Sequence, residues 1–181
     1  MKHSSGSGLW VVMGVAGAGK TTAGHALAAH LDVPCGDADD FHPAENVAKM
    51  RAGVALDDSD RAPWLAAVGT WLALQGEGAV ISCSALRRSY RDILRLHAGP
   101  VRFLHLAGPA EVVRARVEAR TDHYMPASLV DSQYAALEPL GPDEDGITVR
   151  FDEPVDQIVH QAAALIHRTT TLQPRSLGAL S

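Results

Sequence analysis

Hydrophobic residues along the chain fall into two alternating kinds of block. Runs of four to six mostly apolar residues are separated by longer stretches in which apolar residues recur every three or four positions. Short apolar runs are typical of strands buried on both faces of a parallel sheet, whereas the longer spacing is typical of amphipathic helices. The runs that we predict to be strands are residues 9–13, 33–36, 79–82, 101–106 and 147–151.

The stretches between these runs carry the helical pattern. It covers residues 21–31, 62–75 and 87–97, and residues 112–140 predict a helix, a short break at 121–126 and a second helix. After Pro154 an apolar stripe is formed by Val155, Ile158, Val159, Ala162, Leu165 and Ile166. This alternation of strands and helices predicts an α/β protein whose five-stranded parallel sheet is joined by right-handed crossovers.

The predicted elements fill residues 9–167, which we interpret as a single domain. Residues 1–8 are rich in Ser and Gly, and residues 168–181 lose the helical period, so both ends are expected to be flexible.

Composition narrows the class of protein. The chain has 181 residues, of which 46% are hydrophobic and 20% are charged, as in ordinary globular proteins. A net charge of -5 gives no general attraction for nucleic acid, and no apolar run is long enough to span a membrane. Two cysteines and the lack of a recognisable signal segment favour a cytoplasmic location.

A phosphate-binding motif follows the first predicted strand. Residues 14–21, GVAGAGKT, match the P-loop pattern and open the next predicted helix. In such a loop glycines turn the backbone amides toward an anion, Lys20 bridges the β- and γ-phosphates, and the Thr21 hydroxyl binds Mg²⁺. The motif predicts that ATP or GTP is bound by Gly14, Ala16, Gly17, Ala18, Gly19, Lys20, Thr21 and Thr22. The alternative is a glycine-rich turn with a surface lysine, which the strand-to-helix context disfavours.

Two carboxylates follow the second predicted strand, at the edge where open α/β sheets bind ligands. In a kinase, one of Asp37 and Asp39 would support hydrated Mg²⁺ and the other would orient and deprotonate the acceptor hydroxyl. An acidic turn that caps the next helix explains the same pair equally well. His42, taken alone, is more often structural than functional.

Two charged clusters extend this region. Lys49 lies seven residues after His42, and Asp58, Asp60 and Arg61 stand at the start of a helix that contains Trp64. The alternative for this second cluster is a solvated charge run in which Ser59 or Asp60 caps the helix.

A third cluster follows the third predicted strand. Arg87 and Arg91 are four residues apart, so we expect them to share one helix face at the ligand edge of the sheet. A guanidinium binds a carboxylate through two parallel hydrogen bonds, so this pair suits an anionic acceptor.

Taken in order, the segments GVAGAGKTT, DADDFHPAENVAKM, LDDSDRAPWL, CSALRRSYRD and SQYAALEPL resemble the gluconokinase family. The resemblance covers about residues 9–163. It implies a P-loop fold like that of nucleoside monophosphate kinases, with a helical lid at about residues 117–138. It also implies phosphorylation of D-gluconate to 6-phospho-D-gluconate by in-line transfer from ATP with Mg²⁺, and it allows a homodimer.

The resemblance also implies roles for individual residues. Asp39 would orient or deprotonate the acceptor hydroxyl, with Asp37 and Thr21 nearer the metal. The sugar acid would be bound by Asp39, His42, Lys49, Asp60, Arg61, Arg87, Arg91, His123 and Gln133, and Arg91 ranks first as the anchor of its carboxylate.

In the predicted lid, Arg116 and Arg120 would balance charge on the transferred phosphoryl group, and the alternative is a solvated face paired with Glu118 or Asp122. Asp122 and Tyr124 depart from the Gly and Phe that relatives often carry.

Two other functions agree with the same sequence features. Another small-molecule kinase of the same fold, acting on shikimate, a nucleotide or a different sugar acid, would carry the same P-loop. A regulatory protein that uses a P-loop nucleotide as a switch would bind ATP without turning over an acceptor.

Overall fold

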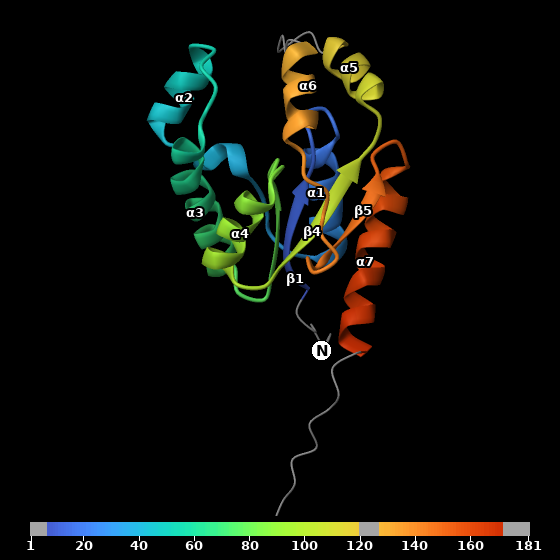
Figure 1. The fold of residues 1–181 in the computed structure, drawn as a ribbon. Coiled ribbons are helices and arrows are strands. Elements are labelled where there is room, and N and C mark those ends of the chain that lie inside the picture. The colour runs from blue at the N-terminus through green and yellow to red at the C-terminus, as the bar shows by residue number, and fades with distance from the viewer. Residues whose placement is uncertain (1–6, 120–126, 172–181) are drawn as a thin grey trace, which may run out of the picture.

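A computed structural model describes residues 7–119 and 127–171 (Figure 1). Its centre is a sheet of five parallel strands in the order β2-β3-β1-β4-β5. The strands are β1 (Gly8–Met13), β2 (Cys35–Asp37), β3 (Gly78–Ser82), β4 (Val101–Ala107) and β5 (Gly146–Arg150). Each predicted strand is present, and the α/β fold class with its five-stranded parallel sheet is confirmed.

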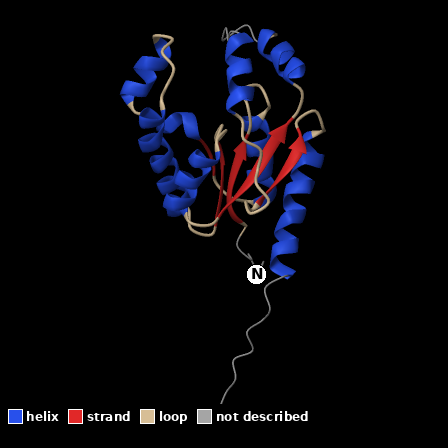
Figure 2. Ribbon diagram, in the orientation of Figure 1, coloured by secondary structure: helices blue, strands red, loops and turns tan. Residues whose placement is uncertain are grey.

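Helices cover both faces of the sheet (Figure 2). They are α1 (Lys20–Leu31), the short 3-10 helix η1 (Ala38–Phe41), α2 (Ala44–Arg51), α3 (Asp58–Leu74), α4 (Arg88–Ala98), α5 (Ala110–Glu118), α6 (Ala127–Ala136) and α7 (Val155–Thr171). Helices α1 and α7 pack together, as do α3 and α4. Within the described ranges, no helix has the length and apolar character needed to cross a membrane.

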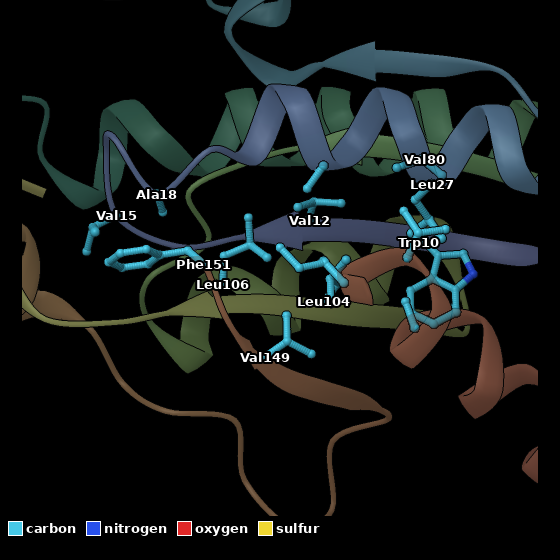
Figure 3. Packing of buried hydrophobic residues seen from close by; sticks show 14 of the residues in the cluster. Trp10, Val12, Val15, Ala18, Leu27, Val80, Leu104, Leu106, Val149 and Phe151 are labelled. Atoms are coloured by element: carbon cyan, nitrogen blue, oxygen red, sulfur yellow. The ribbon is translucent and has the colours of Figure 1, made fainter. Parts of the chain in front are cut away.

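The two faces of the sheet carry separate hydrophobic cores. Trp10 and Val12 of β1 pack with α1 and α7 on one face, as Figure 3 shows. Val11 and Met13 of the same strand pack with α3 and α4 on the other face. Because successive residues of a strand point to opposite faces, burial on both sides explains why the whole run from Leu9 to Met13 is apolar.

The start of α3 differs from the prediction. The helix begins at Asp58, four residues before the predicted residue 62, and its N-cap is Asp57 and not Ser59 or Asp60. The Asp57 carboxylate accepts from the Asp60 amide at 2.9 Å, and the Asp60 carboxylate accepts from the Asp57 amide at 3.1 Å. This reciprocal capping satisfies two amides that the helix leaves unpaired. Helix α2 was not predicted, because no long apolar stripe marks its eight residues.

The carboxyl ends of the strands meet at one edge of the sheet, at the top of Figure 1. Helices α5 and α6, which correspond to the predicted helix-break-helix segment, stand at this edge on one side, and α2 stands on the other. The arrangement places the P-loop, η1 and these helices around the region where parallel α/β sheets bind their ligands.

Candidate active site

The P-loop connects β1 to α1 and has the backbone that its glycines were predicted to allow. Gly14, Gly17 and Gly19 have φ angles of 147°, 81° and 93°. A Cβ atom on Gly14 would lie 2.8 Å from the carbonyl oxygen of Leu106, so only glycine fits there. Lys20 Nζ donates to the Val15 carbonyl oxygen at 3.1 Å. The residues predicted to bind ATP thus form the loop between β1 and α1 and the first turn of α1.

Thr21 and Asp37, the two residues predicted to bind Mg²⁺, lie next to each other. The Thr21 hydroxyl, in the first turn of α1, donates to Asp37 Oδ2 at 3.5 Å. Asp37 Oδ1 accepts from the backbone amide of Asp39 at 3.0 Å and so caps η1. Mg²⁺ is commonly bound by one or two protein oxygens together with phosphate oxygens and water, so these residues fit that ion beside a P-loop. The capping alternative is also correct for Asp37, because one oxygen caps while the other faces Thr21.

Asp39 presents its carboxylate beside the P-loop. Its side chain is 87% exposed, in the first turn of η1. Reduced hydration among the surrounding groups raises the pKa of Asp39, and the Asp37 carboxylate adds to this effect, while His42 and Lys20 oppose it. Because the side chain is so exposed, we expect water to screen these effects. Because Asp37 contacts Thr21 of α1 and also caps the turn that carries Asp39, the predicted donor and acceptor residues share one site.

His42 lies on the wall behind Asp39. Its ring stacks on Trp64, with centroids 4.2 Å apart and planes at 15°, and its side chain is only 5% exposed. Trp64 is held in turn by a 2.6 Å hydrogen bond from its indole nitrogen to the Ala38 carbonyl oxygen. Burial lowers the pKa of His42, against the opposite influence of Asp39. A neutral, fixed imidazole therefore lies with Nε2 3.9 Å from Asp39 Oδ1.

Lys49 and Asp60 bind each other across α2 and α3. Lys49 Nζ lies 2.6 Å and 2.8 Å from the two carboxylate oxygens of Asp60. This hydrogen bonding raises the pKa of Lys49 and lowers that of Asp60. The pair joins the two helices that form the acceptor-side wall, and the Lys49 side chain remains 42% exposed. The geometry thus gives Lys49 and Asp60, both predicted to bind substrate, a structural role first, because their contact joins α2 to α3.

Arg61 and Arg87 meet around Tyr90. Their guanidinium carbons lie 5.6 Å and 5.8 Å from the centre of the tyrosine ring. The Tyr90 hydroxyl accepts from Arg61 at 3.3 Å and donates to Asp58 at 2.6 Å, and Arg87 approaches the same carboxylate at 3.5 Å. The Arg61 and Arg87 side chains are 31% and 44% exposed. Sequence reasoning missed Tyr90, whose only signal was an aromatic residue between Arg87 and Arg91 in the sequence.

The structure buries Arg91, which disfavours the prediction that it anchors the substrate carboxylate. Its side chain is 0% exposed, and its Nε and Nη2 atoms each lie 2.8 Å from the Glu144 carboxylate. Its remaining donors bind carbonyl oxygens of the segments around α4 and after α6, namely those of Ala85, Leu86, Glu138 and Pro139. Arg87 and Arg91 do not share a helix face because Arg87 is the extended N-cap of α4. Hydrogen bonding with Arg91 is the main reason that the pKa of Glu144 falls to about 2.

Two described lid residues reach the nucleotide side of the site. Arg116 of α5 donates to the Gly17 carbonyl oxygen at 3.4 Å and to the Phe151 carbonyl oxygen at 3.3 Å. Gln133 of α6 accepts from the backbone amide of Ala16 at 2.6 Å. In this structure, therefore, Gln133 contacts the P-loop.

The other residues predicted to act in the lid belong to a short segment between α5 and α6. Arg120, Asp122, His123 and Tyr124 lie outside the described residues, so their predicted roles stay predictions.

Comparisons with known proteins agree with this geometry. A family model described as shikimate kinase matches residues 16–140. A gluconokinase of Gluconobacter oxydans is 45% identical over 154 residues, which cover 83% of this chain and 86% of that protein. The thermosensitive gluconokinase of Escherichia coli is 44% identical over 146 residues, covering 79% of this chain and 78% of that protein.

A solved structure extends the match to the fold. The crystal structure of a gluconokinase from Sinorhizobium meliloti superposes with a TM-score of 0.82 at 42% identity, covering 92% of this chain and 95% of that chain. Identity at this level over nearly the whole chain, together with the P-loop and the acidic η1 turn beside it, shows the family. The chain belongs to the gluconokinase family of P-loop kinases.

Proposed function

We propose that this protein transfers the γ-phosphoryl group of ATP to the 6-hydroxyl of D-gluconate. The observation that carries the proposal is the contact between Thr21 of the P-loop helix and Asp37 at the end of β2. It places Asp39, two residues further along, beside the loop that binds the phosphates. One site thus holds a phosphate cradle and an exposed carboxylate suited to accept a proton.

In the proposed donor half, the P-loop amides and Lys20 bind the β- and γ-phosphates of ATP. Thr21 and Asp37 would hold Mg²⁺, which when bound neutralises charge on the phosphate oxygens. Arg116 lies against the Gly17 carbonyl oxygen and is positioned to approach the same phosphates. Asp39 takes the proton of the acceptor hydroxyl as its oxygen bonds to the γ-phosphorus and the bond from that phosphorus to ADP breaks.

In the proposed acceptor half, Arg61 and Arg87 take the place that the sequence assigned to Arg91. Both guanidinium groups are partly exposed and flank Tyr90 at the N-terminus of α4, whereas Arg91 has its donors bound to Glu144 and backbone carbonyls. The exposed Asp58 carboxylate lies 3.8 Å from Arg61 and 3.5 Å from Arg87, which supports the proposal that the pair accommodates a carboxylate. The substrate carboxylate would take the place of Asp58 and be held there by charge-assisted hydrogen bonds. His42, Lys49 and Asp60 then provide mixed donors and acceptors for the hydroxyls of the sugar acid.

A panel of acceptors tests this function. The purified protein with ATP and Mg²⁺ should release ADP when D-gluconate is added, and release much less with shikimate, AMP or other sugar acids. Absence of turnover with gluconate, together with turnover of another acceptor, would assign the chain to a different substrate. Nucleotide binding without turnover of any acceptor would indicate a regulatory P-loop protein.

We also propose that residues 9–167 form one kinase domain and that it works in the cytoplasm. Cys35 and Cys83 are both free thiols, which suits a reducing compartment. Family resemblance allows a homodimer, and light scattering on the purified chain would measure its mass in solution.

A further inference from the structure

Asn46 is a buried polar side chain to which the proposed mechanism gives no role. It belongs to α2, is only 3% exposed, and lies between His42 and the start of α3. Its Nδ2 atom lies 2.9 Å from the Asp60 carbonyl oxygen and 3.4 Å from Nδ1 of His42. One amide nitrogen, with two hydrogens, therefore serves both partners.

The Asp60 contact determines the orientation of the amide. A backbone carbonyl oxygen only accepts hydrogen bonds, so the Asn46 atom beside it must be the nitrogen. The same nitrogen then faces Nδ1 of His42, and because an amide NH₂ only donates, Nδ1 must carry a lone pair. The single proton of the neutral ring is left on Nε2.

The proton on Nε2 faces the proposed base. Nε2 lies 3.9 Å from Asp39 Oδ1, too far for a direct hydrogen bond. A hydroxyl oxygen placed at hydrogen-bonding distance from both atoms would accept from Nε2 and donate to Asp39. Trp64 stacks on the ring at 4.2 Å and resists the rotation that would exchange the two ring nitrogens.

We propose that Asn46 is a positioning residue that keeps the His42 proton on Nε2, so that His42 donates to the acceptor hydroxyl while Asp39 takes that hydroxyl's proton. This inference rests on the proposed function for the identity of the acceptor. It assigns proton removal to Asp39 alone, because Nε2 with its proton in place has no lone pair to accept another. Burial of the ring favours the neutral form that this arrangement needs, since it lowers the pKa of His42.

The tautomer is measured directly on the wild-type chain by long-range proton-nitrogen NMR of the His42 ring, with no gluconate present. We expect Nδ1 to be unprotonated and Nε2 to carry the proton. A proton on Nδ1 would overturn the proposal. Because this readout needs no turnover, it stands apart from the proposed function, which the acceptor panel tests separately.

Kinetics then show whether Asn46 acts through His42. We expect Asn46→Ala to lower kcat for gluconate roughly tenfold or more with the KM for ATP unchanged, since the donor half is intact. The exposed neighbouring change Glu45→Ala is the matched control and should leave kcat unaltered.

A double-mutant cycle separates positioning from packing. In His42→Gln the amide nitrogen of Gln replaces Nε2 as the donor. An amide nitrogen always carries its protons, so it donates without help from residue 46. Adding Asn46→Ala to this variant should therefore cause no further fall in kcat. An equal fall in both backgrounds would show that Asn46 acts only by joining α2 to α3, and would overturn the proposal. Melting temperatures of the four proteins show that folded enzyme is being compared.

Discussion

At the scale of single residues, charged side chains in this protein divide by what their hydrogen-bonding atoms contact. The Asp39 carboxylate is 87% exposed and lies 3.9 Å from His42 Nε2 in the proposed site. The Arg91 guanidinium is fully buried and is occupied by Glu144 and backbone carbonyls. Exposure and committed partners, more than residue type, therefore distinguish a group that can act on a substrate from one that stabilises the fold.

Replacing Asp39 tests the proposed base. Asp39→Asn keeps the size of the side chain but removes the carboxylate that would accept the proton, so kcat should fall by about 10²- to 10⁴-fold. The KM for ATP and the melting temperature should stay close to wild type, because the side chain is exposed. Steady-state kinetics and thermal unfolding measure both, and near-normal kcat would remove Asp39 from the mechanism.

A matched pair of arginine variants tests the revised carboxylate site. Arg87→Ala removes a partly exposed guanidinium beside Tyr90, and the KM for gluconate should rise about 10- to 100-fold with little change in stability. Arg91→Met leaves Glu144 buried without its main partner and should lower the free energy of unfolding by about 3–5 kcal/mol.

Gluconate kinetics and urea unfolding of both variants show which arginine binds the substrate carboxylate. If folded Arg91→Met lost gluconate affinity while Arg87→Ala kept it, the original assignment to Arg91 would stand.

At the scale of elements, the acceptor-side wall is joined by polar contacts between short helices. Lys49 of α2 binds Asp60 of α3, and Asn46 of α2 donates to the Asp60 carbonyl oxygen. On the other side of the site, Gln133 of α6 accepts from the Ala16 amide of the P-loop. The first turn of α3 is thus the point to which α2 is attached, and its geometry sets the position of the wall.

Loss of the α3 cap measures how much that turn depends on it. Asp57→Ala removes the carboxylate that accepts from the Asp60 amide, and the free energy of unfolding should fall by about 0.5–2 kcal/mol. Thr70→Ala is the matched control, since Thr70 is exposed further along α3 and its hydroxyl donates to the Ala66 carbonyl oxygen, away from the cap. Denaturant unfolding compares the two, and equal small losses would show that Asp57 does not cap the helix in solution.

Sequence patterns predicted strands and long helices well, and the polar wall less well. The apolar run from Leu9 to Met13 predicts its strand directly, because a strand buried on both faces is apolar throughout. The P-loop glycines likewise predict the positive φ angles that the loop adopts. Helix α2 has no such stripe, because it contacts its neighbours through Asn46 and Lys49. The inward direction of Arg91 depends on Glu144, which lies 53 residues away in the sequence, and spacing alone does not reveal that contact.

At the scale of the whole molecule, two hydrophobic cores share one central sheet, so a charge created inside that sheet weakens the entire fold. His105 of β4 is such a point, with a side chain in the buried sheet and Nδ1 3.3 Å from the Thr148 hydroxyl. Its Nε2 atom has no hydrogen-bond partner among the residues that the structure describes. Burial, with a further contribution from Arg91, lowers the pKa of His105 to about 4.

This shift predicts loss of stability in acid. Between pH 6.5 and about 4 the unfolded chain binds a proton at His105 that the folded protein does not, so stability falls as pH falls through this window. The loss from this one group reaches about 3 kcal/mol. Urea unfolding of wild type and His105→Gln at pH 7 and pH 4.5 measures it. The wild type should lose more stability than the variant, and equal losses would show that His105 titrates normally.

The most direct test of the central claim identifies the product. The wild-type protein is incubated with ATP, Mg²⁺ and uniformly ¹³C-labelled D-gluconate, and the phosphorus-carbon coupling of the product is recorded by NMR. We predict a single phosphorylated acid whose phosphorus couples to C6, formed in step with ADP. Phosphate released without a labelled ester, or an ester at another carbon, would contradict the account.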